Sequence, residues 1–308
     1  MRWLSKSVDT LVATWCDESN EDIPDVVVIG SGYGGSVAAL RAAKHGAKVL
    51  VLERGKEYLS GEFPDGLGSA LGHARLERSD ATHVNGYESG LFDIRVGTDI
   101  GALVGNALGG TSQINAGVVL RPDKRVFDKC DEAGRLWPQA VSDAELSPWY
   151  ERADIEIGAE TFTEVPMHVH DPDSDGPTRV IDIKPEKTAR LDEMATRLGH
   201  KKPREMTVSF EAARLAASFG APATEPNDQP VLAPCNGCGD CVAGCNQNAK
   251  KTLTTTYLPR AKAAGAELFT GVSVLHLSRD EDHWRIHFVA TDFRKAHRDG
   301  IELRVHTL

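Results

Sequence analysis

The fold is decided by residues 25–55, DVVVIGSGYGGSVAALRAAKHGAKVLVLERG. The apolar run over 25–29 is rich in β-branched residues and ends at glycine, as a buried parallel strand does. Residues 36–45 are mostly good helix formers and are followed by Gly46, which predicts a helix that ends there. Residues 48–53 predict a second buried strand. This succession is a β-α-β unit of the usual size, about thirty residues.

The turn between the first strand and the helix carries a dinucleotide fingerprint, G-x-G-x-x-G, at Gly30, Gly32 and Gly35. The first glycine permits the tight turn, the second lets the backbone approach a pyrophosphate, and the third packs the helix on the strand. Glu53 ends the second strand, where a carboxylate accepts a hydrogen bond from a ribose 2′-hydroxyl. An acid at this place disfavours a 2′-phosphate, so the pattern predicts FAD or NAD rather than NADP.

A second glycine-rich stretch, VGNALGGTSQINAG, covers residues 104–117. Its glycines would let backbone amides meet another face of a large cofactor, and Asn115 is suited to hydrogen-bond the edge of an isoalloxazine ring. The alternative interpretation is a flexible surface loop.

Four cysteines lie within eleven residues, at Cys235, Cys238, Cys241 and Cys245. Their spacing, C-x2-C-x2-C-x3-C, is the run that ligates a [4Fe–4S] cluster in bacterial ferredoxins. The contiguous ligands disfavour structural zinc, which usually uses two separate knuckles, and the short spacing would strain disulfides. Asn246 replaces the proline of the ferredoxin pattern, and only one run is present. We therefore expect one cluster, [4Fe–4S] or [3Fe–4S], with zinc, free thiols or a disulfide as open alternatives.

Two lysines, Lys250 and Lys251, follow the cysteine run. Beside a cluster their charge would raise its potential or dock an acidic electron acceptor. The simpler interpretation, which we favour slightly, is the solvated start of a helix over 252–264.

The rest of the chain gives coarser expectations. Residues 56–99 are rich in glycine and polar residues and predict long loops, and residues 161–234 are rich in Pro, Asp and Thr. Helices are predicted over 143–159 and near 188–198. Period-2 patterns over 267–277 and 283–290 predict an antiparallel hairpin.

At this point the chain resembles the glucose-methanol-choline (GMC) family of flavin oxidoreductases, and within it the cholesterol-oxidase-like bacterial branch. The resemblance covers residues 25 to about 290 and rests on 30–35, 53–55, 105–117, 120–122, 137–138, 146–153, 249–252 and 257–259. It implies an α/β, Rossmann-like FAD-binding domain that is C-terminally incomplete. The expected parts are an N-terminal tail or docked lead-in (1–24), the first part of the FAD domain (25–130), an inserted and partly irregular substrate-side segment with the cysteines (131–251), and a truncated return to the FAD domain (252–308).

The resemblance also assigns cofactor residues. Gly30, Gly32, Gly35 and Glu53, with the neighbouring Arg54, would hold the ADP half of FAD. The pyrophosphate and flavin would be lined by Gly105, Gly109, Gly110, Ser112, Asn115, Ala116 and Gly117. The backbone of Val274 would meet the adenine, although a plain core strand residue is an equally good interpretation.

The catalytic histidine of the family cannot be assigned, because it belongs near the end of a longer chain and this one stops at Leu308. His168-Val169-His170 has a metal-like spacing but is better explained as a polar loop. The family strand that closes the FAD sheet is also missing. We therefore expect an N-terminal fragment, a truncated product or half of a split enzyme, with poor stability or aggregation when it is expressed alone.

Composition narrows the function. With 35 Lys plus Arg against 45 Asp plus Glu, the net charge of −10 argues against nucleic acid. No apolar stretch is long enough to span a membrane, no secretory signal is recognisable, and the cysteines do not form a secreted disulfide framework, so we expect a cytoplasmic protein. The resemblance implies oxidation of an alcohol, such as a sterol or another hydrophobic alcohol, by hydride transfer to FAD, with a protein or oxygen as electron acceptor. The alternatives are a non-catalytic FAD and iron–sulfur electron-transfer module that needs a partner chain, and an inactive truncated fragment.

Overall fold

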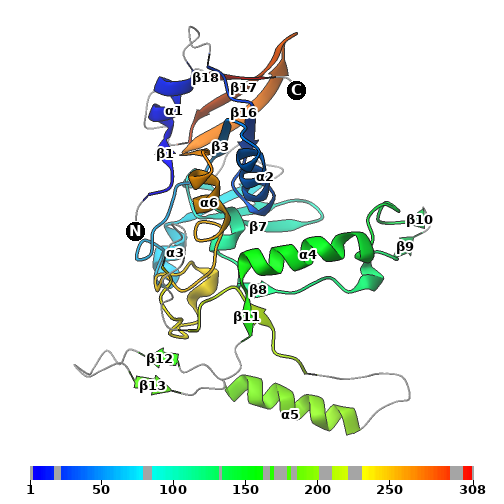
Figure 1. Cartoon of the computed structure of the whole chain (residues 1–308). Coiled ribbons are helices and arrows are strands. Elements are labelled where there is room, and N and C mark those ends of the chain that lie inside the picture. The colour runs from blue at the N-terminus through cyan, green and yellow to red at the C-terminus, as the bar shows by residue number, and fades with distance from the viewer. Residues whose placement is uncertain are drawn as a thin grey trace.

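The computed structural model describes residues 3–16, 22–78, 85–131, 134–161, 167–169, 179–181, 186–200, 210–220, 231–291 and 301–306 (Figure 1). Its helices are α1 (Val8–Trp15), α2 (Tyr33–Lys44), α3 (Gly66–Leu71), α4 (Asp143–Ile157), α5 (Glu186–His200) and α6 (Tyr257–Ala263), with 3-10 turns η1 (Gly110–Gln113), η2 (Lys124–Val126) and η3 (Asp240–Val242). None of the described helices is long and apolar enough to cross a membrane.

A parallel sheet with strand order β1-β15-β3-β2 lies at the centre. Its strands are β1 (Lys6–Ser7), β15 (Glu267–Thr270), β3 (Val49–Glu53) and β2 (Val26–Ile29). The helix α2 connects β2 to β3, so the β-α-β unit predicted from residues 25–53 is confirmed. An α/β fold with a Rossmann-like nucleotide-binding unit is thus present.

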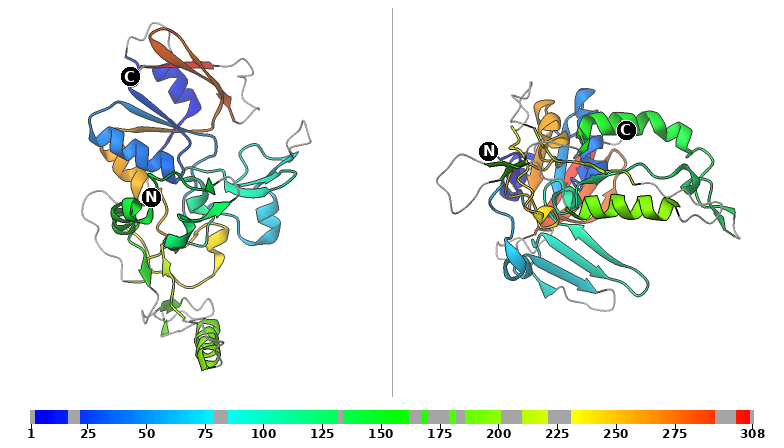
Figure 2. Two further views of the ribbon diagram at one scale, coloured as in Figure 1. Left: turned by 90° about the vertical axis from the view of Figure 1, so that its right-hand side faces the viewer. Right: turned by 90° about the horizontal axis from the view of Figure 1, so that it is seen from below.

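The two faces of this sheet bury different apolar clusters. One face packs against α2 and α6 through residues such as Leu40, Val51 and Leu258. The other face packs against α1 and an antiparallel sheet of β16 (Val272–Arg279), β17 (His283–Ala290) and β18 (Ile301–His306) through Leu11, Leu52 and Phe288. Figure 2 shows these layers from two further sides. Packing on both faces holds the carboxyl ends of β2 and β3 in place, and the fingerprint turn begins at the end of β2.

A strand predicted over 267–277 is in fact two strands in different sheets. Gly271 separates β15 from β16 and has a φ of +75°, a left-handed conformation that suits glycine. The hairpin of β16 and β17 is confirmed. The helix predicted over 252–264 begins only at Tyr257, because Thr255 and Thr256 hydroxyls bond the carbonyl of Thr252 and form a turn instead.

The loops predicted over 56–99 contain three strands, β4 (Ala74–Arg78), β5 (Asn85–Gly86) and β6 (Phe92–Val96). With β7 (Gly101–Gly105) they form a sheet of order β5-β4-β6-β7. The prediction of loops was wrong for these strands. Arg75 and Asp93 are buried at positions where apolar side chains would have shown the alternating strand pattern, so the pattern was not recognisable. Smaller pairings join β8 (Val118–Val119), β11 (Glu160–Thr161) and β14 (Arg214–Leu215), β9 (Cys130–Asp131) with β10 (Gly134–Arg135), and β12 (Met167–Val169) with β13 (Arg179–Ile181). In Figure 1, α5 and the β12–β13 hairpin lie at the bottom, away from the central sheet.

The N-terminal segment is docked on the core rather than loose. Glu57 is buried and its carboxylate accepts hydrogen bonds from the amides of Leu4 and Ser5 and from the Ser5 hydroxyl, at 2.7–3.1 Å. Lys262 Nζ donates to the carbonyls of Trp3 and Leu4, at 3.0 and 2.7 Å. We call the bonds of Glu57 and Lys262 to residues 3–5 the N-terminal clamp. Leu11 of α1, which follows in the chain, is fully buried.

We expect Glu57→Gln to loosen this segment, because an amide group places donors against the donors of Leu4 and Ser5. The predicted cost is about 1–3 kcal/mol in the free energy of unfolding, the penalty for unsatisfied buried polar groups. Urea denaturation measures the cost, and amide hydrogen exchange at residues 4–7 reports the release. Glu62→Gln is the control, because Glu62 is exposed and bonds only the nearby Leu59 amide. Equal effects of the two substitutions would contradict the clamp.

Candidate functional site

The fingerprint turn leaves the end of β2 and enters α2. Gly30 has a φ of +91°, and its amide donates to the Leu52 carbonyl of β3 at 2.8 Å. A Cβ built on Gly35 would lie 1.9 Å from the Gly30 carbonyl oxygen, so this position tolerates only glycine in this backbone. Around Gly32 and Gly34, in contrast, a Cβ would meet nothing within 4 Å. The turn is therefore closed on the protein side and open on the other side, beside the N-terminus of α2.

The two glycine-rich segments meet at this turn. The Gly109 amide donates to Ser31 Oγ at 2.9 Å, and a Cβ on Gly110 would approach Gly32 Cα to 3.0 Å. Asn115 Nδ2 donates to the Tyr33 hydroxyl at 2.9 Å. The sequence placed residues 30–35 and 105–117 near one ligand, and the structure brings them into direct contact.

Glu53 lies at the centre of this junction and is buried. One oxygen accepts from the amide and hydroxyl of Ser31, at 2.8 and 2.6 Å, and the other accepts from the Gly55 amide at 3.1 Å. The Ser31 hydroxyl thus donates to Glu53 while it accepts from Gly109, which locks the carboxylate, the turn and the second segment together.

The remaining predicted residues take distinct places. Ser112 is buried and its hydroxyl bonds the Gly109 carbonyl at 2.7 Å, and Gly105 contacts Gly110, where a Cβ would lie 2.6 Å from the carbonyl oxygen. Ala116 is exposed beside Gly117, whose φ is +73°. Val274 lies half-buried on β16, next to an irregularity in the register with β17.

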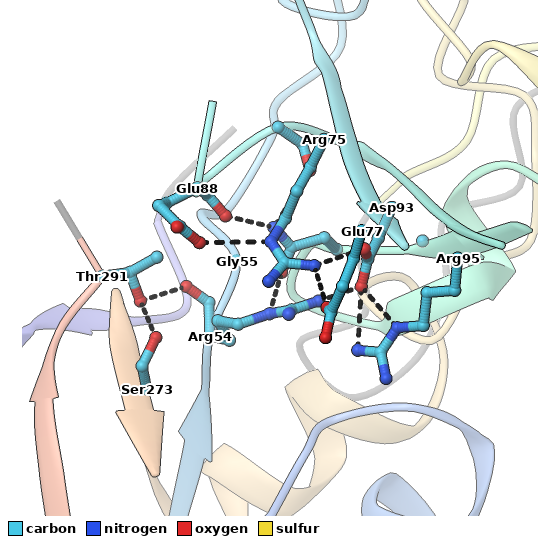
Figure 3. Close-up of polar contacts among 12 residues, drawn as sticks. Arg54, Gly55, Arg75, Glu77, Glu88, Asp93, Arg95, Ser273 and Thr291 are labelled. Carbon is cyan, nitrogen blue, oxygen red and sulfur yellow. Dashed lines mark hydrogen bonds and ion pairs between the residues drawn. The ribbon is translucent and has the colours of Figure 1, made fainter. Parts of the chain in front are cut away.

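The Arg54 side chain points into a charged network (Figure 3). Its guanidinium bonds Asp93 and, at 2.9 Å, the side-chain oxygen of Asn106. Asp93 is fully buried and also accepts from Arg75 and Arg95. Burial raises the pKa of Asp93, but hydrogen bonds from the three guanidinium groups outweigh it and hold the pKa below its usual value.

The network is a support that sequence reasoning missed. Asn106 Nδ2 also donates to the backbone carbonyls of Glu88 and Gly90. The carboxylates of Glu77 and Glu88 each pair with Arg75, so three carboxylates, with that of Asp93, face three guanidinium groups. The available signal was Asn106 within a stretch of small residues, where an amide can satisfy several backbone groups at once. The network fixes Arg54 and residues 105–106 on the protein side of both glycine-rich segments.

The cysteine run packs on residues 60–63. The Ser60 hydroxyl donates to the Cys245 carbonyl at 3.0 Å, and Asn246 accepts from the amides of Gly61 and Phe63. Burial raises the pKa of the Cys235 and Cys241 thiols. Across the part of the chain that the structure describes, which includes all four cysteines of the run, no three His, Cys, Asp or Glu side chains are arranged to hold one metal ion. The four thiols share one loop, and those of Cys238, Cys241 and Cys245 are near enough to that of Cys235 to raise its pKa further.

Lys250 is not the solvated helix start that we favoured. It is 4% exposed, and its ammonium donates to the carbonyls of Gln113, Asn115 and Cys241 at 3.0, 2.6 and 2.9 Å. Burial lowers the pKa of Lys250 to about 8. The adjacent Lys251 donates to the Gly158 carbonyl and pairs with Glu160.

Known proteins resemble this chain, two of them over most of its length. A cholesterol oxidase of Acinetobacter baumannii is 26% identical over 262 residues, which cover 82% of this chain and 40% of that protein. A cholesterol oxidase of Mycobacterium tuberculosis is 28% identical over 284 residues, 87% of this chain and 42% of that protein. A long-chain-alcohol oxidase of Arabidopsis thaliana is 32% identical over 112 residues, 36% of this chain and 13% of that protein. Among solved structures, a formate oxidase of Aspergillus oryzae matches 94% of this chain and 44% of its own, with 15% identity and a TM-score of 0.43.

The chain spans about two fifths of the length of the two cholesterol oxidases. The family model described as GMC oxidoreductase matches residues 25–302, a range that runs from β2 into β18 and includes both glycine-rich segments, the charged network and the cysteine run. The chain therefore belongs to the GMC oxidoreductase family.

Proposed function

We propose that this chain is the FAD-binding portion of an oxidoreductase that oxidises an alcohol. The observation that carries the proposal is the junction of the two glycine-rich segments at the carboxyl end of β2, open beyond Gly32 and next to a helix N-terminus. Such an end presents free amides and a positive dipole to a pyrophosphate. Membership of the GMC family gives the class of reaction.

The residues fit a dinucleotide. Gly30, Gly32 and Gly35 would hold the pyrophosphate, because a Cβ at Gly32 would occupy space that is empty of protein. Glu53 would turn a carboxylate oxygen to the ribose, with its position set by Ser31 and Gly55. The flavin side would be lined by Gly105, Gly109, Gly110, Ser112, Asn115, Ala116 and Gly117, and the adenine by the backbone of Val274. The role of Arg54 would be to hold the turn through Asp93 and Asn106, not to touch the cofactor.

When bound, the flavin supplies the acceptor for the hydride that leaves the alcohol carbon. The residues of this chain hold and orient the cofactor, and we assign none of the described residues as the base. The cholesterol oxidases and the long-chain-alcohol oxidase among the relatives favour a sterol or another hydrophobic alcohol as substrate. Oxygen, or an acceptor protein, would then reoxidise the flavin.

The experiment that tests the proposal is an anaerobic absorption spectrum of the purified 308-residue chain, followed by titration with FAD. We expect flavin bands in the purified protein, or saturable quenching of FAD fluorescence at one site per chain, and weaker binding of NADP. A chain that binds no FAD under conditions where it is folded would contradict the proposal. Binding of FAD without any alcohol-dependent bleaching, in the presence or absence of a partner chain, would favour the non-catalytic module.

A cluster at the cysteine run stays a prediction of the spacing alone. Backbone amides do point at two of the sulfurs, from Gly237 to Cys235 and from Ala249 to Cys245, both at 3.4 Å, as around cluster thiolates. We expect iron and acid-labile sulfide in anaerobically purified protein, at about four of each per chain for a [4Fe–4S] cluster. Cys241→Ser should lower both. Absence of iron and sulfide, with four thiols titrating in the run, would leave these residues with a structural role.

A further inference from the structure

The buried ammonium of Lys250 joins two segments that have different chemistry. Two of its three hydrogen bonds go to the carbonyls of Gln113 and Asn115, and the third goes to the carbonyl of Cys241. No carboxylate in the described part of the chain forms an ion pair with it. Its donors are thus divided between the cofactor-facing segment and the cysteine run.

Both ends of this connection also have hydrogen bonds of their own, such as those from the amides of Ile114 and Asn115 to the Thr111 carbonyl. On one side, the Gly117 amide bonds the side chain of Asn115, and Asn115 also reaches Tyr33 of the fingerprint turn. On the other side, Cys241 lies in the short turn η3, between Gly239 and Gly244, which both have positive φ. The backbone of Lys250 itself is fixed, because its neighbours Ala249 and Lys251 bond Ser218 and Ala216. The Lys250 side chain therefore connects the two segments from a backbone position that is held in place.

We propose that Lys250 is a positioning residue that couples the chemical state of the cysteine run to the conformation of residues 113–117. That these residues face the flavin rests on the proposed function, whereas the coupling itself does not. Leaving one N–H group of a buried ammonium without an acceptor costs much free energy. If the Cys241 carbonyl moves, the Lys250 ammonium must therefore move with it, and its bonds to Gln113 and Asn115 rearrange. Because such coupling is reciprocal, occupation of the cofactor site must also alter the cysteine run.

The cysteine run can be reached from solvent. Cys238 is exposed, and a cavity of about 750 Å³ is lined by Cys245 and Lys250 together with Gln113. Alkylation of the thiols with iodoacetamide is therefore a practical way to change the state of the run. The Cys130→Ser variant removes the other exposed thiol, and Cys16 reacts slowly because burial raises its pKa to about 11.

The first test reads the coupling without any cofactor. Hydrogen exchange at the amides of residues 114–117 is measured by mass spectrometry before and after alkylation, in the Cys130→Ser background. We expect alkylation to accelerate exchange by at least about fivefold, the lower range for coupled sites. In Lys250→Met the amides should exchange fast already, and alkylation should add nothing. Lys251→Met is the matched control and should respond to alkylation as the background protein does, because the Lys251 ammonium bonds Gly158 and Glu160 rather than the two segments in question.

The second test uses FAD affinity in the same three proteins. Alkylation should weaken FAD binding about fivefold in the background protein and in Lys251→Met, and have no effect in Lys250→Met. In return, saturating FAD should slow alkylation of Cys238, the exposed thiol of the run, in the two proteins that keep Lys250 but not in Lys250→Met. If Lys250 had only a structural role, Lys250→Met would weaken FAD binding by the same factor before and after alkylation.

Two results would overturn the inference. One is that exchange at residues 114–117 does not change on alkylation of the background protein, a measurement that needs no variant of Lys250 to fold. The other is that Lys250→Met, with a native near-ultraviolet circular dichroism spectrum, still responds fully. Failure of the background protein to bind FAD would refute the proposed function, while the exchange experiment would still decide the coupling.

Discussion

Gly32→Val is expected to weaken FAD binding by about a hundredfold and to leave the fold intact. Gly32 is the N-cap of α2 with φ −63° and ψ −170°, an extended conformation that valine adopts without strain. No protein atom lies within 4 Å of the new Cβ, so the side chain fills only the open side of the turn. Loss of about two charge-assisted hydrogen bonds to a pyrophosphate, about 1.5 kcal/mol each, accounts for the expected factor.

The measurement is a fluorescence titration with FAD, accompanied by a thermal melt. Gly34→Ala is the matched control, because a Cβ at Gly34 also meets open space but the position is outside the G-x-G-x-x-G pattern. The control should bind FAD nearly as the wild type does, and all three proteins should melt within a few degrees of one another. Wild-type affinity in Gly32→Val would show that the cofactor does not lie against this turn.

Asp93→Asn is expected to lower the free energy of unfolding by about 3–5 kcal/mol, the cost of removing one partner from a buried ion pair. The carboxylate is fully buried and bonds three guanidinium groups, which would be left facing a neutral amide that adds two donors of its own. Because the network supports Arg54 and Asn106, FAD affinity should fall as well. Urea denaturation of the variant and the wild type gives the difference directly.

Glu77→Gln is the control for this substitution. Glu77 pairs with the same Arg75, but its side chain is 45% exposed, so water replaces the lost partner and we expect a change below about 1 kcal/mol. Comparable losses for the two substitutions would mean that burial of Asp93 is not what makes its charge important.

The pH dependence follows from the direction of the Asp93 shift. Because the folded pKa is lower than the unfolded value of about 3.9, the stabilisation is complete above that value and is lost as the pH falls through the folded pKa. The difference in stability between wild type and Asp93→Asn should therefore be constant near neutral pH and shrink below about pH 4. A difference that persists unchanged at pH 2 would contradict the charged network.

The sequence predicted the nucleotide-binding unit well because each local signal there agrees with the tertiary structure. β-branched runs, a helix bounded by glycine and an acid at a strand end all lie within residues 25–55, and each agrees with the way this unit packs. The sequence assigned residues 30–35 and 105–117 to one large cofactor from their shared chemistry, and the bonds of Gly109 and Asn115 to the fingerprint turn bring the two segments together.

The support around the site was not predictable in the same way. Strands β4 and β6 were missed because their buried positions hold Arg75 and Asp93, whose charges are tolerated only because the partners come from distant segments. Lys250 was assigned to a solvated helix for the same reason, since its three acceptors are carbonyls and leave no mark on the sequence. Periodicity detects apolar burial, whereas polar burial depends on partners that only the fold identifies.

The order of strands in the parallel sheet has a consequence for synthesis on the ribosome. β15 lies between β1 and β3, so residues 6–7 and 50–53 find their neighbour only at residues 267–270. Until that part of the chain emerges, β1 and one side of β3 lack their native neighbour, although 266 residues precede Glu267. Contacts so far apart in sequence form slowly. We therefore expect the nascent chain to depend on chaperones that hold apolar segments, and to become protease-resistant only late in translation.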